Sequence, residues 1–469
     1  MKKVLYIISA ALMLAMAASC EKKLEIIPLG QTTLDNLDDL ETLLNKEPQI
    51  SDFGIESSAL DHEMLCNNIY GWSSIASMLS NHSSMKYVML TYDESIDRTD
   101  LVITSTFYNT LYSRINYMNV IISKAPDTAG GTPEKRAQLI AEARVLRAWY
   151  HFLLVNTYAR QYDEAAASQL GGIAYVDNTN VAEQKTKLTL AEVYTRILED
   201  CSDDVLADLI QSNVADPCRF GVDFGYGVRA RVLFQMKRYD EALRYANLAL
   251  GVNGRIEDRS GIASSFQWDL AEDAPNNYYL IWRTNIMNYG EYFGWAMSPD
   301  VYRLIDPNDY RMLYEYWMDN AISDFPDAML YYGMGLVWYN VWGIRAETMY
   351  YLKAEVMIRN GSIEEGLAEI DKVRELRIDP WGFEPLAGRG ASKAEAMKML
   401  QDSKRVEFLN TYENFCDRKR WNSEPEYAES IIRDLGEYGT FELRPDSPLW
   451  VFPFPADAVN YNSSLTQNF

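Results

Sequence analysis

Residues that bind metal ions are scarce in this sequence. It contains 3 histidines and 5 cysteines in 469 residues, and His62, His82 and His151 are far apart in the chain. No two cysteines have the C-x-x-C spacing. Zinc sites of proteins combine such residues at short spacings. The sequence therefore predicts neither a metal site nor a bound cofactor.

Two further absences exclude broad classes of protein. Lysine and arginine number 44 against 67 aspartates and glutamates, which gives a formal charge of −23. So acidic a surface repels phosphate backbones, and nucleic-acid binding is excluded as a function. After the first twenty residues no run of 18 apolar residues occurs, so we expect no membrane-spanning helix. Hydrophobic residues make up 48 % of the chain, which is enough for a large core.

The first twenty residues have the pattern of a bacterial lipoprotein signal. Lys2 and Lys3 precede an uncharged apolar run, Val4 to Ala18, and small residues then lead to Cys20. We expect residues 1–19 to be removed and Cys20 to be acylated, so that the membrane holds the chain through lipid alone. Among the other cysteines, Cys201 and Cys218 could form a disulfide, and two buried free thiols fit the sequence equally well.

Helical periodicity dominates from about residue 101 to about residue 251. Thr132 and Pro133 have the residue types of an N-cap and a first helical position, and Gly130 and Gly131 precede them. Two antiparallel helices are therefore expected to meet there. His151 lies within the second helix, and we interpret it as a packed or hydrogen-bonded residue.

An internal repeat indicates the architecture. Residues 230–243 align without gaps on residues 354–367, an offset of 124 positions. In both copies a helix with small residues ends in a short turn. Two acidic residues, then a small residue and a leucine, begin a second helix. This pattern is typical of tetratricopeptide repeats. Repeat-like helices are predicted at about 101–251 and at about 343–377.

Between these helices lies a region of different composition, at about residues 252–342. Asn276 to Asn340 holds 15 of the chain's 43 Tyr and Trp residues, where an even spread would give about six. Glycines and prolines interrupt this stretch, so it is predicted to form loops and short strands, with Tyr278 to Trp282 as one strand. After the second repeat copy, Ser392 is expected to cap a helix that runs to about Asn414.

Several motifs together resemble the SusD/RagB family of nutrient-uptake lipoproteins. These motifs are Cys20 with the stretch Leu24 to Gly30, the helix residues Tyr108, Tyr112, Ile115 and Asn119, the helix Ala141 to Tyr150, the segment Ser298 to Arg311, a late group of Arg405, Glu407, Phe408, Asp417, Arg420 and Trp421, and a closing segment with Pro453, Pro455, Asn462, Leu465, Gln467 and Asn468. In the late motif Thr411, Tyr412 and Asn414 replace the usual Glu, Gly and Arg. That departure puts the local ion-pair network in doubt.

The resemblance implies a mainly α fold: a single SusD-like domain over 20–469, in which tetratricopeptide-like helix pairs form an α-α superhelical scaffold and support a loop-rich ligand-binding insertion. It further implies that the protein is not an enzyme. Such proteins sit on a SusC-like TonB-dependent barrel at the outer membrane and pass captured oligosaccharides into it. The implied location is therefore the outer membrane, facing the cell exterior.

Flat aromatic rings bind the apolar face of a sugar, and amides bind its hydroxyl groups. On these grounds the candidate ligand residues are Trp72, Asn81, Tyr92, Tyr289, Tyr292, Trp295 and Trp317. Peptide capture by the same fold and a structural lid without a ligand stay open as alternatives. A glycosidase is disfavoured because acid pairs such as Asp203-Asp204 and Glu364-Glu365 lie on helices, where adjacent side chains diverge.

Overall fold

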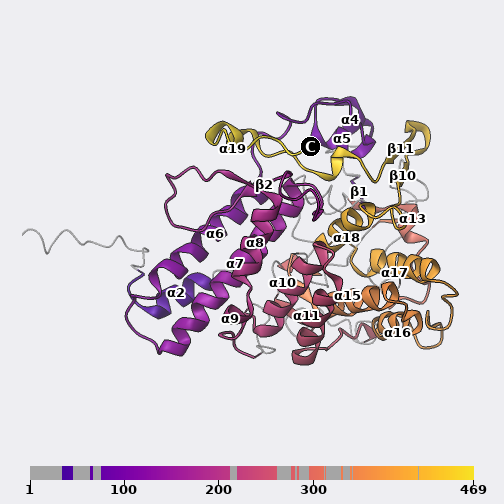
Figure 1. The fold of residues 1–469 in the computed structure, drawn as a ribbon. Coiled ribbons are helices and arrows are strands. Elements are labelled where there is room, and N and C mark those ends of the chain that lie inside the picture. The colour runs from indigo at the N-terminus through magenta and orange to yellow at the C-terminus, as the bar shows by residue number, and fades with distance from the viewer. Residues whose placement is uncertain are drawn as a thin grey trace, which may run out of the picture.

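The computed structural model describes residues 34–45, 64–66, 75–211, 219–260, 276–279, 283–284, 295–310, 312, 329–330, 339–340, 342–409 and 411–469. The fold is mainly helical, as predicted, and Figure 1 shows the helices side by side. The earlier helices are α2 (Leu37–Leu44), α4 (Ile75–Ser80), α5 (Met85–Thr91), α6 (Thr106–Lys124), α7 (Pro133–Tyr158), α8 (Leu190–Asp200), α9 (Asp203–Leu206), α10 (Val222–Gln235) and α11 (Tyr239–Val252). The later ones are α13 (Pro299–Tyr302), α15 (Ala346–Arg359), α16 (Ile363–Arg374), α17 (Lys393–Glu407), α18 (Tyr412–Asn422) and α19 (Ala456–Tyr461), with 3-10 turns η3 (Gly436–Tyr438) and η4 (Pro448–Trp450).

The helices pair as antiparallel hairpins of the tetratricopeptide type. The first hairpin joins α6 to α7, and the Thr132 hydroxyl caps α7 by accepting a hydrogen bond from the backbone N–H of Lys135. Gly130 and Gly131 both have positive φ in the turn before it. The predicted cap and turn are therefore confirmed.

The two copies of the sequence repeat become the hairpins α10–α11 and α15–α16. Helix α11 packs against α15, so the copies are neighbours in space although a long insertion separates them in the chain. The scaffold thus continues through the chain from α6 to α17. Between α7 and α8, residues 159–189 are not helical and hold the strands β2 (Gly171–Ala174) and β3 (Lys187–Thr189).

Short antiparallel strands pair across the chain. A three-stranded sheet has the order β1 (Met64–Cys66), β6 (Trp295–Met297) and β7 (Met329–Leu330). Two-stranded pairs join β4 (Asn277–Tyr279) to β9 (Ile344–Arg345), β5 (Arg283–Thr284) to β8 (Tyr339–Asn340), and β10 (Ile431–Asp434) to β11 (Thr440–Leu443). The strand predicted at Tyr278 begins as expected, and its residues 280–282 lie outside the described part.

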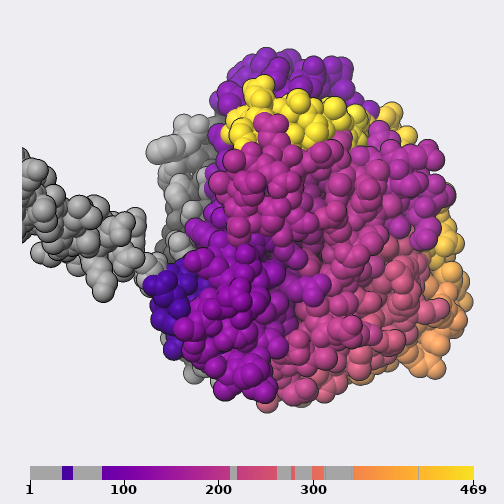
Figure 2. Space-filling model, turned by 60° about the vertical axis from the view of Figure 1, so that its left-hand side comes forward, coloured from indigo at the N-terminus to yellow at the C-terminus, as the bar shows by residue number. Residues whose placement is uncertain are grey.

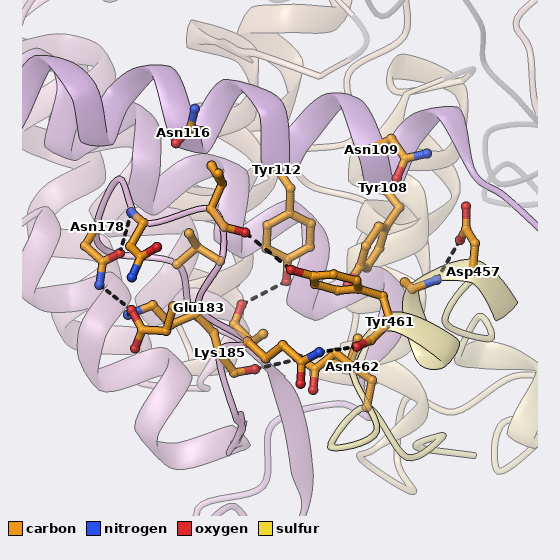
Figure 3. A pocket seen from close by; sticks show the side chains of 17 residues that line it. Tyr108, Asn109, Tyr112, Asn116, Asn178, Glu183, Lys185, Asp457, Tyr461 and Asn462 are labelled. Atoms are coloured by element: carbon orange, nitrogen blue, oxygen red, sulfur yellow. Dashed lines mark hydrogen bonds and ion pairs between the residues drawn. The ribbon is translucent and has the colours of Figure 1, made fainter.

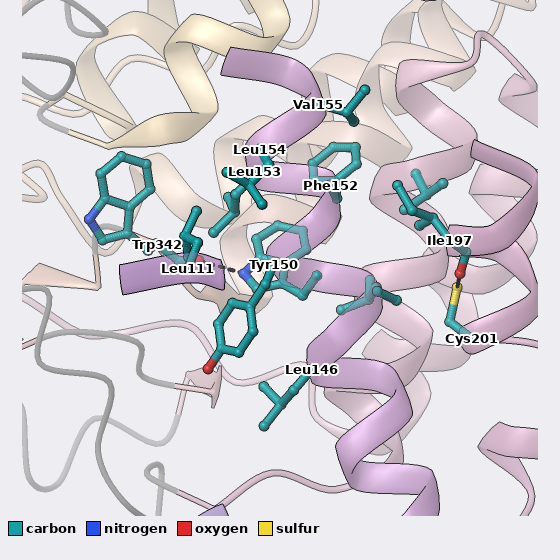
Figure 4. Packing of buried hydrophobic residues seen from close by; sticks show 14 of the residues in the cluster. Leu111, Leu146, Tyr150, Phe152, Leu153, Leu154, Val155, Ile197, Cys201 and Trp342 are labelled. Atoms are coloured by element: carbon teal, nitrogen blue, oxygen red, sulfur yellow. Dashed lines mark hydrogen bonds between the residues drawn. The ribbon is translucent and has the colours of Figure 1, made fainter. Parts of the chain in front are cut away.

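One hydrophobic cluster runs from Leu37 to Leu465 and includes α2, α6, α7, α8, α10 and α11. In Figure 4 its side chains surround α7, with Leu146, Tyr150 and Phe152 directed into the packing. The indole N–H of Trp149 donates a 2.7 Å hydrogen bond to the backbone carbonyl of Trp342. This bond satisfies a buried donor and ties α7 to the segment before β9.

The C-terminal residues close the fold as a band across the body, yellow in Figure 2. The backbone N–H of Phe452 donates to the carbonyl of Thr157, and the N–H of Ala456 donates to Val102. The guanidinium of Arg98 donates to the Val451 carbonyl at 2.7 Å. The band therefore links the start of the scaffold to the end of the chain.

The late family motif forms a buried ion-pair network despite its departures. Arg420 pairs with Glu355 and with Asp417, which also pairs with Lys404, and all four side chains are inaccessible to solvent. Because buried charges need partners, this network fixes α18 against α15 and α17. At the three departing positions the polar groups donate to backbone carbonyls: Thr411 to Phe408, Tyr412 to Leu153 and Asn414 to Arg405.

The helix predicted from Ser392 to about Asn414 is wrong at its end. Ser392 caps α17 as expected, but the helix ends at Glu407 and α18 begins at Tyr412. The N–H and the hydroxyl of Thr411 both donate to the Phe408 carbonyl and close a turn there. Such local bonds compete with the helical pattern.

His151 and Cys201 have structural roles. The Nδ1 of His151 lies 2.8 Å from the Arg147 carbonyl, and its Nε2 accepts from the N–H of Val176. Burial lowers the pKa of this imidazole to about 3, so it is neutral, as a packed residue should be. Cys201 is a buried free thiol that donates to the Ile197 carbonyl, while Cys218 lies outside the described residues.

None of the helices in the described part of the chain is long and apolar enough to cross a membrane. Within the same residues, no group of three His, Cys, Asp or Glu side chains is placed to hold a metal ion.

Candidate functional site

Most residues predicted to bind a ligand fall where the structure gives no side chains. Trp72, Tyr289, Tyr292 and Trp317 lie outside the described residues, as does Cys20. Trp295 belongs to strand β6, where its backbone pairs with Cys66 of β1, but its side chain is outside the described part. Their assignment to a ligand site stays a prediction.

The other two predicted residues lie at opposite ends of α5. Asn81 is exposed in the turn before this helix, where its carbonyl accepts a 2.9 Å hydrogen bond from the Ser84 hydroxyl. Tyr92 ends the helix with a φ of 53° and is 5 % exposed. The Arg433 guanidinium lies 4.6 Å from its ring centroid. In this structure Tyr92 is thus part of the core, where its ring is not accessible to a ligand.

A groove of about 410 Å³ lies between α6, the segment 174–185 and the C-terminal residues 457–465 (Figure 3). Small-molecule sites in proteins are typically a few hundred Å³ in volume and mainly apolar, with a few polar groups. The groove has this character. Its lining residues are Tyr108, Asn109, Tyr112, Asn116, Ala174, Val176, Asn178, Asn180, Val181, Glu183, Gln184, Lys185, Asp457, Ala458, Tyr461, Asn462 and Leu465.

Helix α6 forms the first wall. Tyr108 and Tyr112 are four residues apart, so they lie on one face of the helix, with ring centroids 4.7 Å apart. The Tyr112 hydroxyl donates to the Ala174 carbonyl at 2.8 Å. Burial raises the pKa of both tyrosine hydroxyls, so both stay protonated and can donate hydrogen bonds at neutral pH. Asn109 and Asn116 on the same helix add amide groups.

The second wall is the segment 174–185, which polar contacts hold in place. The amide of Asn119 donates to the carbonyls of Val176 and Asn178 at 3.0 and 3.1 Å. The Asn178 amide in turn donates to the Glu183 carboxylate, which also pairs with Lys185. Both contacts lower the pKa of Glu183, and the hydrogen bond from Asn178 has the larger effect. The Glu183 carboxylate is therefore charged at neutral pH.

The third wall is α19 with the residues that follow it. Tyr461 is 58 % exposed, and its hydroxyl lies 3.4 Å from the carbonyl of Val181, which is 76 % exposed. The Gln184 amide donates to the Tyr461 carbonyl at 2.6 Å, and the Asn462 amide donates to the Lys185 carbonyl at 2.7 Å. Hydrogen bonds thus connect the second and third walls along one side of the groove.

This arrangement suits recognition of a ligand through rings and amides. Tyrosine rings provide flat apolar surface, and each amide can both donate and accept hydrogen bonds. The sequence analysis did not predict this site, because the groove is formed by three segments that are far apart in the chain. Tyr108, Tyr112 and Asn462 stood out only as family motif residues, and no local pattern marked Tyr461.

Residues 34–217 match the model of a family described as SusD-like, starch-binding and associating with the outer membrane. The fold also matches solved structures. One is a candidate sugar-binding protein from Bacteroides vulgatus, with a TM-score of 0.71 and 15 % identity, where the match covers 93 % of this chain and 99 % of that one.

Two further matches are SusD superfamily proteins. The one from Bacteroides thetaiotaomicron has a TM-score of 0.68 and 16 % identity over 92 % of this chain and all of its own. The one from Bacteroides fragilis has a TM-score of 0.69 and 15 % identity over 93 % of this chain and all of its own. A comparison with curated proteins found no match. Residues 34–217 are therefore similar to the SusD-like family, and the solved structures show that the chain has a SusD fold over more than nine tenths of its length.

Proposed function

We propose that this protein is a cell-surface glycan-binding lipoprotein, which captures oligosaccharides and delivers them to a partner TonB-dependent outer-membrane transporter. The observation that supports sugar as the ligand is the tyrosine- and amide-lined groove between α6 and α19. The predicted aromatic site around Trp295 would provide a second set of rings.

The chemistry of a sugar matches this lining. A pyranose ring has an apolar face of C–H bonds, which packs on an aromatic ring, and a rim of hydroxyl groups that both donate and accept hydrogen bonds. Tyr461 offers an exposed ring, and Asn109, Asn178 and Gln184 offer amides around it. A peptide site would depend more on backbone pairing along a strand edge.

In each acid pair considered for hydrolysis, one member has another role in the structure. Asp203 accepts a hydrogen bond from the Tyr245 hydroxyl and pairs with Arg244. Glu364 accepts from the backbone N–H of Gly388 and so holds a loop. We therefore propose a binding protein and not a hydrolase.

Calorimetric titration tests the proposed ligand class. The chain from Glu21 onward, which contains every described residue, is titrated with maltoheptaose, with hexasaccharides of other linkages and with short peptides. Saturable sugar binding that weakens in Tyr461→Ala or Trp295→Ala, and not in the exposed control Ile432→Ala, supports capture. Peptide binding alone would replace the proposal with peptide uptake, and product release from a sugar would replace it with catalysis.

Delivery and anchoring are tested in cells. Deletion of the gene is expected to slow growth on the sugar that binds, and the intact gene is expected to restore growth. Cys20→Ala, which removes the site of acylation, is expected not to restore it. Normal growth with an unacylated protein would contradict the lipoprotein part of the proposal.

A further inference from the structure

A tryptophan stands fully in solvent on the loop between α16 and α17. Trp381 is 98 % exposed, whereas Trp149 and Trp342 are 1 % exposed in the core. Tryptophan has the largest apolar side chain and usually buries most of it, so a ring displayed in this way is a candidate contact for a ligand.

The loop that carries Trp381 is held rigidly. The two carboxylate oxygens of Asp371 accept the backbone N–H groups of Leu386 and Ala387, each at 2.9 Å. Arg374 donates to the Glu384 carbonyl, also at 2.9 Å. The N–H of Trp381 itself donates to the Asp379 carboxylate at 2.9 Å. Binding to a residue on such a well-held backbone requires little further ordering of the main chain.

Polar groups lie beside the backbone of the loop that carries this ring. The N–H of Asp379 donates to the Asn308 carbonyl at 3.0 Å, so the loop pairs with the turn that follows α13. A Cβ atom on Gly382 would come within 2.2 Å of the Asn308 amide nitrogen, which shows that this amide packs against the residue next to Trp381. The Asp306 carboxylate accepts from the Asn308 backbone N–H and side chain at 2.8 and 3.1 Å.

The surroundings favour a sugar over a protein partner. The anchor residues of protein interfaces lie among other apolar side chains. In the described part of the α16–α17 loop and of the Asn308 turn, Trp381 is instead the only exposed large apolar side chain, and the exposed positions near it in the chain are Pro307, Asn308, Pro380, Glu384 and Pro385. The Asn308 turn also follows β6 and α13 directly, and it therefore borders the region predicted to bind glycans.

We infer that Trp381, with Asn308 and Asp306 beside it, forms a second sugar-binding surface, on which one pyranose unit of an oligosaccharide stacks against the indole. This inference rests on the proposed function, because it takes the ligand to be a glycan. In Figure 1 the α16–α17 loop lies at the lower right and α19 at the upper left, so this surface is separate from the groove.

Titration of variants tests the inference. Wild type, Trp381→Ala, Trp381→Phe, Gly382→Ala and the control Ile432→Ala are each titrated with maltoheptaose and with the other oligosaccharides of the panel. Loss of one aromatic contact is expected to weaken the affinity for the sugar that binds by about tenfold in Trp381→Ala. Trp381→Phe should keep most of the affinity, because it keeps a ring.

Gly382→Ala leaves the indole in place and displaces the Asn308 amide, so it is expected to weaken binding severalfold without removing a ring. Circular dichroism and thermal unfolding check that each variant is folded. Trp381→Ala and Trp381→Phe change an exposed side chain, so little change in the unfolding temperature is expected, whereas Gly382→Ala should lower it because its Cβ would come within 2.8 Å of the Asn308 Cβ.

The possible failures are distinguishable. If wild type binds a sugar and Trp381→Ala binds it equally well, the Trp381 surface is wrong and the proposed function stands. If wild type binds no sugar in the panel, both are overturned. If Trp381→Ala changes only self-association in sedimentation or only peptide binding, the ring is a protein contact and the inference is wrong.

Discussion

Lys237 and Gly361 occupy the same position in two copies of one turn, 124 residues apart, and both have a positive φ, of 61° and 94°. The residues that follow them, Arg238 and Ser362, share φ and ψ values of −82° and 64°. The sequence repeat is therefore also a repeat of backbone conformation. Glycine adopts a positive φ without steric cost, whereas a residue with a Cβ atom does not.

Gly361→Ala is expected to lower the free energy of unfolding by about 1 kcal/mol. No atom lies within 4 Å of a Cβ placed there, so the cost comes from the backbone conformation alone. Gly251→Ala is the matched control, because its Cβ also meets nothing but its position is inside α11. That change should raise stability by up to about 1 kcal/mol. Urea unfolding measures both, and equal effects of the two variants would contradict this account.

The contrast between this turn and the groove shows what the sequence could predict. A tetratricopeptide turn depends on neighbouring residues, so the pattern around Lys237 was readable. The same holds for the Thr132 cap and for the packed role of His151. The groove joins Tyr112, Val176 and Tyr461 from three distant segments, and a sequence does not state which distant segments meet.

Charged residues gave the second difficulty. Because Thr411, Tyr412 and Asn414 depart from the usual residues of the late motif, the sequence left its ion-pair network in doubt. In the structure Asp417 and Arg420 are fully buried, since partners from α15 and α17 neutralise them. The predicted end of α17 was wrong for a related reason. Thr411 closes a turn through its own hydrogen bonds, and the periodicity of a helix does not reveal such bonds.

Glu355→Gln is expected to lower the free energy of unfolding by about 3 kcal/mol, because it removes one of the two countercharges of buried Arg420 and of Arg359 and leaves them only Asp417 and Glu424. Burial alone would raise the pKa of Glu355, but the charges of Arg420 and Arg359 outweigh it and lower the pKa to about 2. A lowered carboxyl pKa stabilises the fold above its ordinary value of 4.5, and this contribution is lost as the pH falls toward 2.

Urea unfolding of wild type and Glu355→Gln at several pH values between 2 and 6 checks both statements. The stability difference between the two proteins should shrink as the pH falls through this range. Glu365→Gln, at an exposed position of α16, is the control and should change stability little. A difference that does not vary with pH would contradict the ion-pair account.

Lys419 should make stability rise with pH above neutrality. Its ammonium is buried and donates to the carbonyls of Asn156 and Ala159 at 2.6 and 2.7 Å, at the C-terminal end of α7. Burial lowers its pKa to about 7 from an ordinary value of 10.5. Between these values the unfolded chain binds the proton that the folded protein releases, so the free energy of unfolding increases as the pH rises.

Lys419→Met removes this titration, so the stability of wild type relative to the variant should increase from pH 7 to pH 9, by at most about 1.4 kcal/mol per pH unit. Urea unfolding across this range provides the measurement. Lys393→Met, at an exposed position of α17, is the control and should show no such trend. A flat difference for Lys419→Met would mean that the buried amine keeps its proton.

Asn462→Ala is expected to weaken sugar binding in the groove about fivefold, because the walls of the groove are then held less firmly in position. The Asn462 amide donates to the Lys185 carbonyl, and its oxygen accepts from the N–H and hydroxyl of Ser464. Without these bonds the segment 174–185 is less tightly held to α19, so its amide hydrogen exchange should accelerate. Calorimetry and hydrogen exchange measure the two effects, with the exposed Asn360→Ala as control. Weaker binding with unchanged exchange would mean that Asn462 contacts the sugar directly, and unchanged binding with faster exchange would mean that the sugar binds elsewhere.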